Sequence, residues 1–285
     1  MKNELKDTRQ YNLDLMKAVA IISMVFCHPV LRLGMYTLGY GLVSGEFPDE
    51  TLYAFLCQDI LQFAGVALVA TGIFIRIGLR ESHILATGLI LSVIGTAVPD
   101  VDTGHYVLNT LLGTFLYTTE ETSCFCFANW YIFVASGLVF GKILQSLADK
   151  DFLYRKLQIV SGCIAAVYIA STCIFGVCFL SRNHYYYTVS PLEAAGLMSI
   201  DLFVLSSFHF LLKKTDVSEF RVFVEMSMNI TRIYFIHWII LGFIEVVFCY
   251  LNEMVFTYPL IYSIGAVLLI VSSVLARKWK YRKVA

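Results

Sequence analysis

The sequence predicts an all-α fold, a polytopic helical bundle in a membrane with about eight transmembrane helices and one re-entrant or short helix. Of the 285 residues, 58% are hydrophobic and 15% are charged, against about 45–50% and about 25% in soluble domains. The mean hydropathy is +0.73. The apolar residues also fall in runs of about 20, the length at which a helix crosses roughly 30 Å of hydrocarbon. We therefore expect the lipid bilayer to be the chain's surroundings.

Each predicted span must be a helix, because backbone groups in lipid have to form hydrogen bonds within their own segment. The third run is short, and the seventh is long enough to be tilted or broken. A further stretch, 105–117, is too short to span and predicts a re-entrant or surface-lying helix. No linker or repeat divides the runs, so we predict one transmembrane domain over 1–285. The eight predicted spans are 12–33, 52–75, 83–99, 124–144, 157–180, 192–212, 222–250 and 258–276.

Basic residues set the orientation, since Lys and Arg are retained on the cytoplasmic side. The opposite connections collect acidic residues such as Glu46, Asp100 and Glu120. This pattern predicts a protein of the cell membrane with both termini in the cytoplasm and 105–117 on the outer side. The basic residues on the predicted cytoplasmic side are Lys2, Lys6, Arg9, Arg76, Arg80, Lys142, Lys150, Arg155, Lys156, Lys213, Lys214, Arg221, Arg277, Lys278, Lys280, Arg282 and Lys283.

Charge and cysteine content exclude several classes of function. The 21 basic and 21 acidic residues cancel, so no net field favours nucleic acid. The eight cysteines fall mostly inside apolar runs and form no C-x-x-C pair. We therefore expect neither a disulfide framework nor a metal site. The first apolar run lacks a small-residue cleavage site and is expected to stay as a helix.

The first predicted helix carries Asp14, Lys17 and His28. Lys17 and His28 are separated by about 1100°, or about 20° after whole turns, and by about 16 Å along the axis. Asp14 falls within about 40° of His28. One helix face thus presents a cation at the membrane edge and an imidazole deeper in the bilayer. Charged groups at membrane depth are costly and are typical of functional sites.

Imidazole suits a general base, because its unperturbed pKa of about 6.5 lies near ambient pH. Transfer of an acyl group from a thioester to an alcohol needs such a base beside the acceptor oxygen. An alternative interpretation is that Lys17 only follows the orientation rule and His28 only bonds a neighbouring helix. Periodicity alone leaves both interpretations open.

The stretch from Tyr11 to His28, with Asp14 followed by Leu15 and ten residues between Lys17 and His28, resembles the opening of the acyltransferase-3 family of integral membrane acyltransferases. The stretch 65–74 resembles the second helix of that family, and 232–238 resembles its late histidine stretch. A related alternative is the heparan-glucosaminide N-acetyltransferase family, which 129–141 resembles.

The resemblance implies a membrane acyltransferase that moves an acyl group, expected to be acetyl, from cytosolic acyl-CoA to a hydroxyl or amine of an envelope carbohydrate or similar acceptor. It implies no bound cofactor, with acyl-CoA as donor substrate. His28 would be the catalytic base, and Lys17 a donor-binding cation. Arg76 and Arg80, spaced i and i+4 at the end of the second helix, would face the CoA phosphates. His237 would orient a substrate or form a structural hydrogen bond between helices.

Other polar residues in the apolar runs are predicted to be structural or to serve another function. Glu225, Asn229 and Arg232 share a helix face, which predicts an internal ion pair. The carboxylates of Asp59, Glu193, Asp201 and Glu245 cannot be paired from the sequence. The alternative function is a proton-coupled transporter or flippase that uses such carboxylates, although no repeated halves are detectable.

Overall fold

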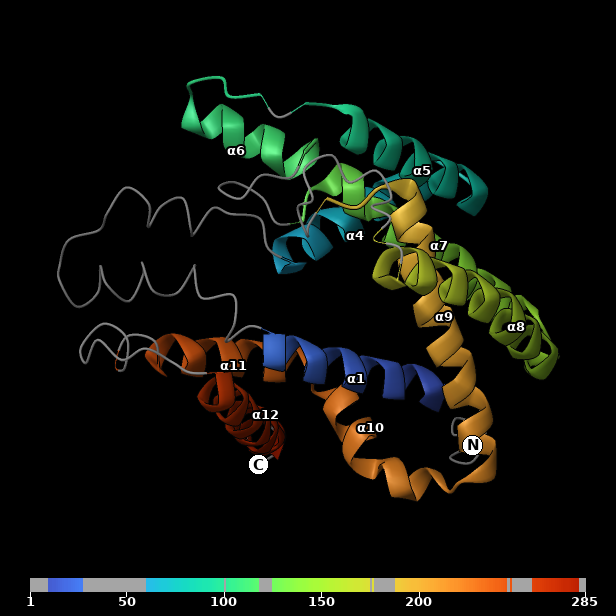
Figure 1. Cartoon of the computed structure of the whole chain (residues 1–285), viewed down its shortest axis with the longest axis vertical. Helices are drawn as coiled ribbons and strands as arrows, with labels where there is room; N and C mark the ends of the chain where they lie inside the picture. Colours follow the sequence, from blue (N-terminus) through green and yellow to red (C-terminus); the bar gives the residue numbers. More distant parts are fainter. Residues whose placement is uncertain are drawn as a thin grey trace. The chain divides into compact units, whose positions relative to one another are not determined.

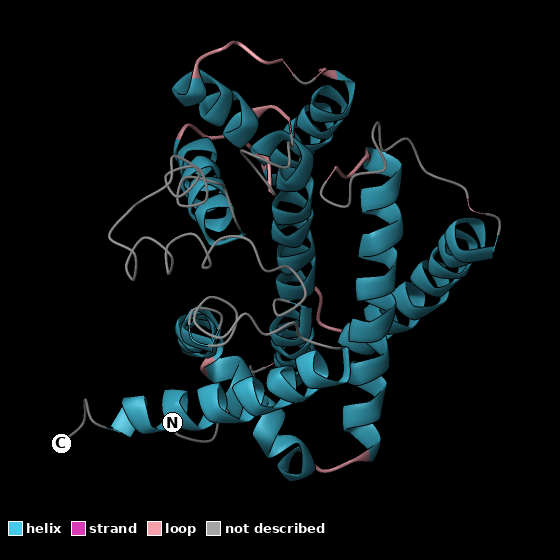
Figure 2. Cartoon of the chain, turned by 60° about the vertical axis from the view of Figure 1, so that its left-hand side comes forward, coloured by secondary structure: helices cyan, strands magenta, loops and turns pink. Residues whose placement is uncertain are grey.

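The chain is helical throughout the part that the structure describes, and no strand occurs there (Figure 2). The structure is a computed structural model. It describes residues 10–27, 60–99, 101–117, 125–174, 188–244 and 258–281, together with Gly176 and Val247. The helices in chain order (Figure 1) are α1 (Tyr11–Cys27), α4 (Ile60–Arg76), α5 (Glu81–Ala97), α6 (Tyr106–Phe115), α7 (Phe127–Ser146), α8 (Lys150–Ile169) with a π-helical turn (Ala170–Ile174), α9 (Pro191–Lys214), a short 3-10 helix (Val217–Phe220), α10 (Arg221–Met228), α11 (Ile230–Ile244) and α12 (Tyr258–Tyr281).

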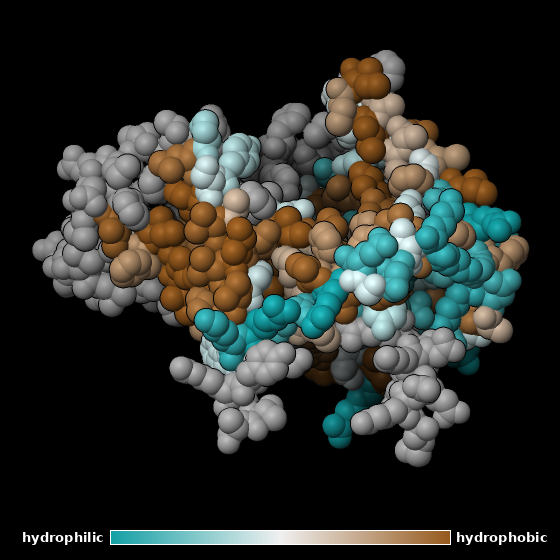
Figure 3. Space-filling view, turned by 90° about the horizontal axis from the view of Figure 1, so that it is seen from below, coloured by the Kyte–Doolittle hydropathy of each residue, from teal (hydrophilic) through white to brown (hydrophobic). Residues whose placement is uncertain are grey.

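Four of the described helices are long and apolar enough to cross a membrane, or five if α10 and α11 form one bent span. Their outer surfaces are apolar: Val160 and Val167 on α8 and Val267 and Ile270 on α12 are each more than half exposed. Figure 3 shows apolar side chains, in brown, over much of the surface in view. Exposed apolar side chains are favourable in contact with lipid and unfavourable in contact with water. The all-helical class predicted from composition is thus confirmed for the described residues, and several of their helices could span a membrane. The four full-length helices are Phe127–Ser146, Lys150–Ile174, Pro191–Lys214 and Tyr262–Trp279.

Two irregular features of the predicted spans are confirmed. The stretch 105–117 forms the short helix α6 of 10 residues, which rises only about 15 Å at about 1.5 Å per residue. The seventh run is broken: α10 and α11 meet at Asn229 with a bend of 66°. The first and second predicted spans are described only over 12–27 and 60–75, and the rest of each lies outside the described residues.

The start of α8 differs from the prediction. The helix begins at Lys150, not at 157, because the Asp149 side chain accepts the backbone N–H of Phe152 at 3.0 Å and caps the first turn. Arg155 and Lys156 therefore lie on the exposed side of a helix and not in a connection. A capping residue decides where a helix begins, while hydropathy reports only where its apolar part begins.

The loop before α6 is held by Asp102. One carboxylate oxygen of Asp102 accepts the backbone N–H of Gly104 at 2.9 Å and the Asn109 amide at 2.7 Å. These two hydrogen bonds, with Gly104 the stronger influence, hold the pKa of Asp102 below its usual range. The Thr103 hydroxyl donates to Asn109 Oδ1 at 2.7 Å. The short helix is thus tied to its own loop by side-chain hydrogen bonds.

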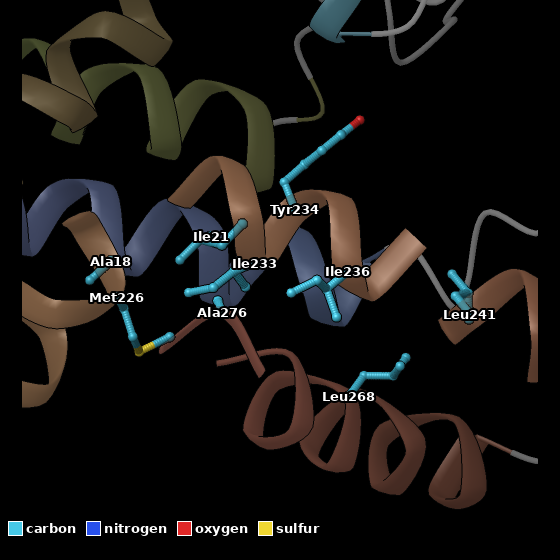
Figure 4. Close-up of a cluster of buried hydrophobic side chains, with 9 residues drawn as sticks. All are labelled: Ala18, Ile21, Met226, Ile233, Tyr234, Ile236, Leu241, Leu268 and Ala276. Atoms are coloured by element: carbon cyan, nitrogen blue, oxygen red, sulfur yellow. The ribbon is translucent and has the colours of Figure 1, made fainter. Parts of the chain in front are cut away.

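The contacts divide the chain into two compact units. The first unit comprises Met1–Phe55 with Leu205–Ala285, and the second comprises Leu56–Val204. In the first unit, α1 packs against α10, α11 and α12. Figure 4 shows the buried cluster that joins these helices, which contains Ala18, Ile21, Met226, Ile233, Tyr234, Ile236, Leu241, Leu268 and Ala276.

The second unit is built on the close packing of α5 against α7. The buried face of α5 consists of Ile84 and three small residues, Gly88, Ser92 and Gly95. A Cβ atom on Gly95 would come within 2.9 Å of the Ala128 Cβ, and one on Gly88 within 3.0 Å of the Ala135 Cβ. Small residues let membrane helices approach closely and gain dispersion contacts, because lipid supplies no hydrophobic driving force between them. The glycines of α5 thus set the distance between the two helices.

We expect Gly95→Ala to destabilise the protein by about 1–3 kcal/mol, since an overpacked core forces its neighbours to move. The matched control is Gly137→Ala on α7, where an added Cβ meets no atom within 4 Å. There the better helix propensity of alanine should stabilise by about 0.5–1 kcal/mol. The measurement is the unfolding free energy in mixed micelles. Equal effects of the two substitutions would contradict the close approach at Gly95.

Candidate functional site

The predicted general base, His28, lies outside the described residues, which reach Cys27 in this part of the chain. The helix that precedes it in the chain, α1, is described over Tyr11–Cys27. The site is therefore built from the start of α1 and from the helices of the first unit that pack on it.

Asp14 anchors α1 to α10. Asp14 and Ser227 are 7% and 5% exposed, and the Ser227 hydroxyl donates to Asp14 Oδ1 at 2.7 Å. The contact joins residues 213 positions apart. Leu15 and Ala18, the next buried residues of α1, lie within about 100° of Asp14 around the helix. A hydrogen bond to a buried carboxylate is stronger than one between neutral groups, so this contact fixes how α1 sits on α10.

Lys17 lies one turn after Asp14 and is exposed. Its helix neighbour Ala18 is fully buried in the core of the first unit. The two residues point in different directions because successive side chains on a helix are about 100° apart. The ammonium group is thus free of the core and accessible to an anion.

The break between α10 and α11 is held by Asn229. Its backbone N–H bonds the Met226 carbonyl at 3.0 Å, and its side-chain amide donates to the Glu225 carbonyl at 2.8 Å. Arg232, in the first turn of α11, donates to Asn229 Oδ1 at 2.9 Å. The asparagine thereby supplies partners to backbone and side-chain groups on both sides of the bend.

The predicted ion pair between Glu225 and Arg232 is wrong. Glu225 instead accepts Arg221 Nε at 3.2 Å and also pairs with Arg277 of α12. The prediction assumed one continuous helix through 225–232. The 66° bend at Asn229 separates the two residues onto different helices.

His237 is fully buried in the core of the first unit. Its Nδ1 lies 3.2 Å from the carbonyl oxygen of Ile233, one turn earlier on α11. The ring also lies edge-on to Tyr234, with centroids 5.3 Å apart. These contacts lie within α11, so the predicted hydrogen bond from His237 to another helix and its predicted role in orienting a substrate both stay predictions.

Arg76 and Arg80 are exposed in the second unit, but they do not share a helix face as predicted. Helix α4 ends at Arg76, and Arg80 is the extended residue before α5. Between them Gly78 has φ 86°. The Gly78 N–H bonds the Ile75 carbonyl and the Leu79 N–H bonds the Phe74 carbonyl, both at 3.0 Å. This is a Schellman cap, which ends a helix at a left-handed glycine.

Two further stretches that resemble acyltransferase families, 65–74 and 129–141, lie in the second unit. A polar side chain of each forms hydrogen bonds there. In α4, the hydroxyl of Thr71 donates to the Ala67 carbonyl at 2.7 Å and bonds the Tyr131 hydroxyl of α7 at 3.0 Å. In α7, the amide of Asn129 donates to the Val189 carbonyl at 3.2 Å. Thr71 thus ties α4 to α7, and Asn129 ties α7 to the segment just before α9.

The remaining predicted carboxylates form no common site in the described part of the chain. Asp59 and Glu245 lie outside it, and Asp201 is exposed on α9. Glu193 lies in the first turn of α9, and its backbone N–H bonds the Ser190 hydroxyl at 3.1 Å. Within the described ranges no group of three His, Cys, Asp or Glu side chains could hold a metal ion.

Sequence reasoning missed Ser227 as the partner of Asp14 and Arg277 as the partner of Glu225. The available signal was the polar pair Ser227 and Asn229 in the middle of an apolar run. No family model matches the chain, and no curated protein or solved structure is significantly similar to it.

We expect Ser227→Ala to cost about 1–3 kcal/mol of unfolding free energy, because it leaves the buried Asp14 carboxylate without its hydroxyl donor. Ser263→Ala is the matched control, since that exposed hydroxyl bonds only the Pro259 carbonyl of its own helix and should change stability by less than about 0.5 kcal/mol. A double-mutant cycle with Asp14→Asn should show coupling of about 0.5–3 kcal/mol. Additive effects in thermal unfolding would mean that the two side chains do not interact.

Proposed function

We propose that the chain is an integral membrane acyltransferase with eight spans and both termini in the cytoplasm of the cell membrane. It transfers an acyl group, in the first instance acetyl, from cytosolic acyl-CoA to a hydroxyl or amine of an envelope carbohydrate or similar acceptor. His28 is the general base of this proposal, and Lys17, Arg76 and Arg80 are its donor-binding cations.

The observation that carries the proposal is the packing of α1 against α10 and α11. The two stretches that resemble an acyltransferase, 11–28 and 232–238, are more than 200 positions apart in the sequence. The described parts of both belong to one compact unit and share one buried cluster through Ile21, Ile233 and Ile236. Segments that build one site must meet in the fold, and this packing meets that requirement.

The proposed chemistry is direct transfer. The His28 imidazole takes the proton from the acceptor hydroxyl or amine as its oxygen or nitrogen attacks the thioester carbonyl. The tetrahedral intermediate then collapses, the carbon–sulfur bond breaks, and the departing CoA sulfur takes the proton from the imidazolium. The exposed ammonium of Lys17 would attract the anionic donor to the membrane edge of the same helix.

The break at Asn229 favours a second candidate, a proton-coupled transporter or flippase, because broken helices are typical of transporter binding sites. The discriminating measurement is labelling of a carbohydrate acceptor from radiolabelled acetyl-CoA by the purified protein. A transporter would transfer no label.

We expect His28→Ala to abolish acyl transfer while the protein still inserts and folds. The matched control is His83→Ala, since His83 is an exposed histidine on α5 of the second unit and should retain activity. Removal of a general base lowers the rate by about 100- to 10,000-fold. The measurements are initial rates of transfer and the thermal midpoint of each variant in detergent. Full activity of His28→Ala would reject the assignment of the base.

A further inference from the structure

Glu225 holds two arginines of different helices beside each other. Its two carboxylate oxygens pair with Arg221 of α10 and Arg277 of α12. The arginine side chains are 77% and 54% exposed, whereas that of Glu225 is 27% exposed. One carboxylate thus fixes two guanidinium groups and leaves a positive charge in excess.

Lys17 is next in sequence to a residue of the buried cluster of the first unit. Ala18, Met226 and Ala276 belong to one buried cluster (Figure 4). Each is followed or preceded directly by a charged residue: Lys17 precedes Ala18, Glu225 precedes Met226, and Arg277 follows Ala276. The backbone of each of the three charged residues therefore lies directly beside a member of this cluster, on α1, α10 and α12.

Other charged residues lie close to these in the sequence. Lys278 follows Arg277 and is exposed. The segment just before α10 carries two acidic residues, Asp216 and Glu219. The Asp216 carboxylate accepts the backbone N–H of Ser218 at 3.0 Å. Among the residues named here, four cations exceed three anions by one charge: Lys17, Arg221, Arg277 and Lys278 against Asp216, Glu219 and Glu225.

Stability does not account for this arrangement. Exposed ion pairs contribute little to folding, because water screens the charges and the side chains lose freedom. The orientation rule requires cations on one side of the membrane but does not require two guanidinium groups on one carboxylate. A guanidinium group has five N–H donors in a planar fork that matches phosphate oxygens, so each arginine keeps donors for a ligand.

We propose that Lys17, Arg221 and Arg277 form the binding site for the phosphate groups of the CoA thioester donor, with Glu225 positioning the two arginines. This inference rests on the proposed function and adds two donor-binding residues on the unit that carries Lys17. The recognised chemistry is a phosphate ester or pyrophosphate. An anionic phospholipid headgroup offers the same chemistry, and the experiment separates the two sources.

The first measurement compares two donors that differ only in their phosphates. Arg221→Gln and Arg277→Gln should each raise the KM for acetyl-CoA by about tenfold, which corresponds to about 1.4 kcal/mol. Neither should change the KM for acetyl-pantetheine, which carries no phosphate. The matched control is Arg155→Gln, an exposed arginine on α8 of the second unit. Equal increases for both donors would show a merely structural role, and an unchanged KM for acetyl-CoA would also overturn the proposal.

The second measurement does not depend on catalysis. Calorimetric titration of CoA into the detergent-solubilised protein should show weaker binding by the Arg277→Gln variant and no difference for pantetheine. If the wild-type protein transfers no acyl group yet binds CoA through Arg277, the proposed function fails and the phosphate site stands. If the variant binds CoA as the wild type does but loses affinity for phosphatidylglycerol in mixed micelles, the site belongs to a lipid headgroup and the proposal is overturned.

Discussion

Hydrogen bonding within and between apolar helices is the constraint on which the described structure depends. An apolar environment offers no partner to a polar group, so the backbone forms helices and polar side chains find partners within the protein. Several serines bond the carbonyl one turn earlier, as Ser272 does with Leu268 at 2.6 Å. Others join two helices, as Ser227 does with Asp14. A serine of the first kind forms its hydrogen bond within one helix. A serine of the second kind determines which helices pack against each other.

The helical class, the short helix α6 and the break in the seventh run were predictable, because each follows from the length and period of apolar residues. The partners of the buried polar groups were not. Periodicity relates residues a few turns apart on one helix, but Asp14 and Ser227 are 213 positions apart. Composition and spacing carry no information on such contacts. Of the candidate site, the sequence predicted an exposed Lys17 on α1, whereas the pairing of Glu225 with two arginines came only from the fold. The role of Lys17 in donor binding stays a prediction.

Two wrong predictions share one cause. The face assigned to Arg76 and Arg80 and the ion pair assigned to Glu225 and Arg232 both assumed an unbroken helix. In the first case the left-handed Gly78 ends the helix. In the second case Asn229 interrupts it. Gly78 has a positive φ that other residues rarely adopt, whereas Asn229, at φ −115°, bonds the Glu225 carbonyl through its side chain. Angular arguments should therefore stop at glycine and asparagine inside an apolar run.

The contact of α5 with α7 has a thermal consequence. Association driven by water weakens as temperature falls, because the ordering of water around apolar groups is what drives it near room temperature. Gly88, Ser92 and Gly95 instead bring α7 close enough for dispersion contacts between the two helices. A helix pair that is held by dispersion contacts should stay packed at low temperature. The second unit should therefore stay folded under chilling that weakens a water-soluble core.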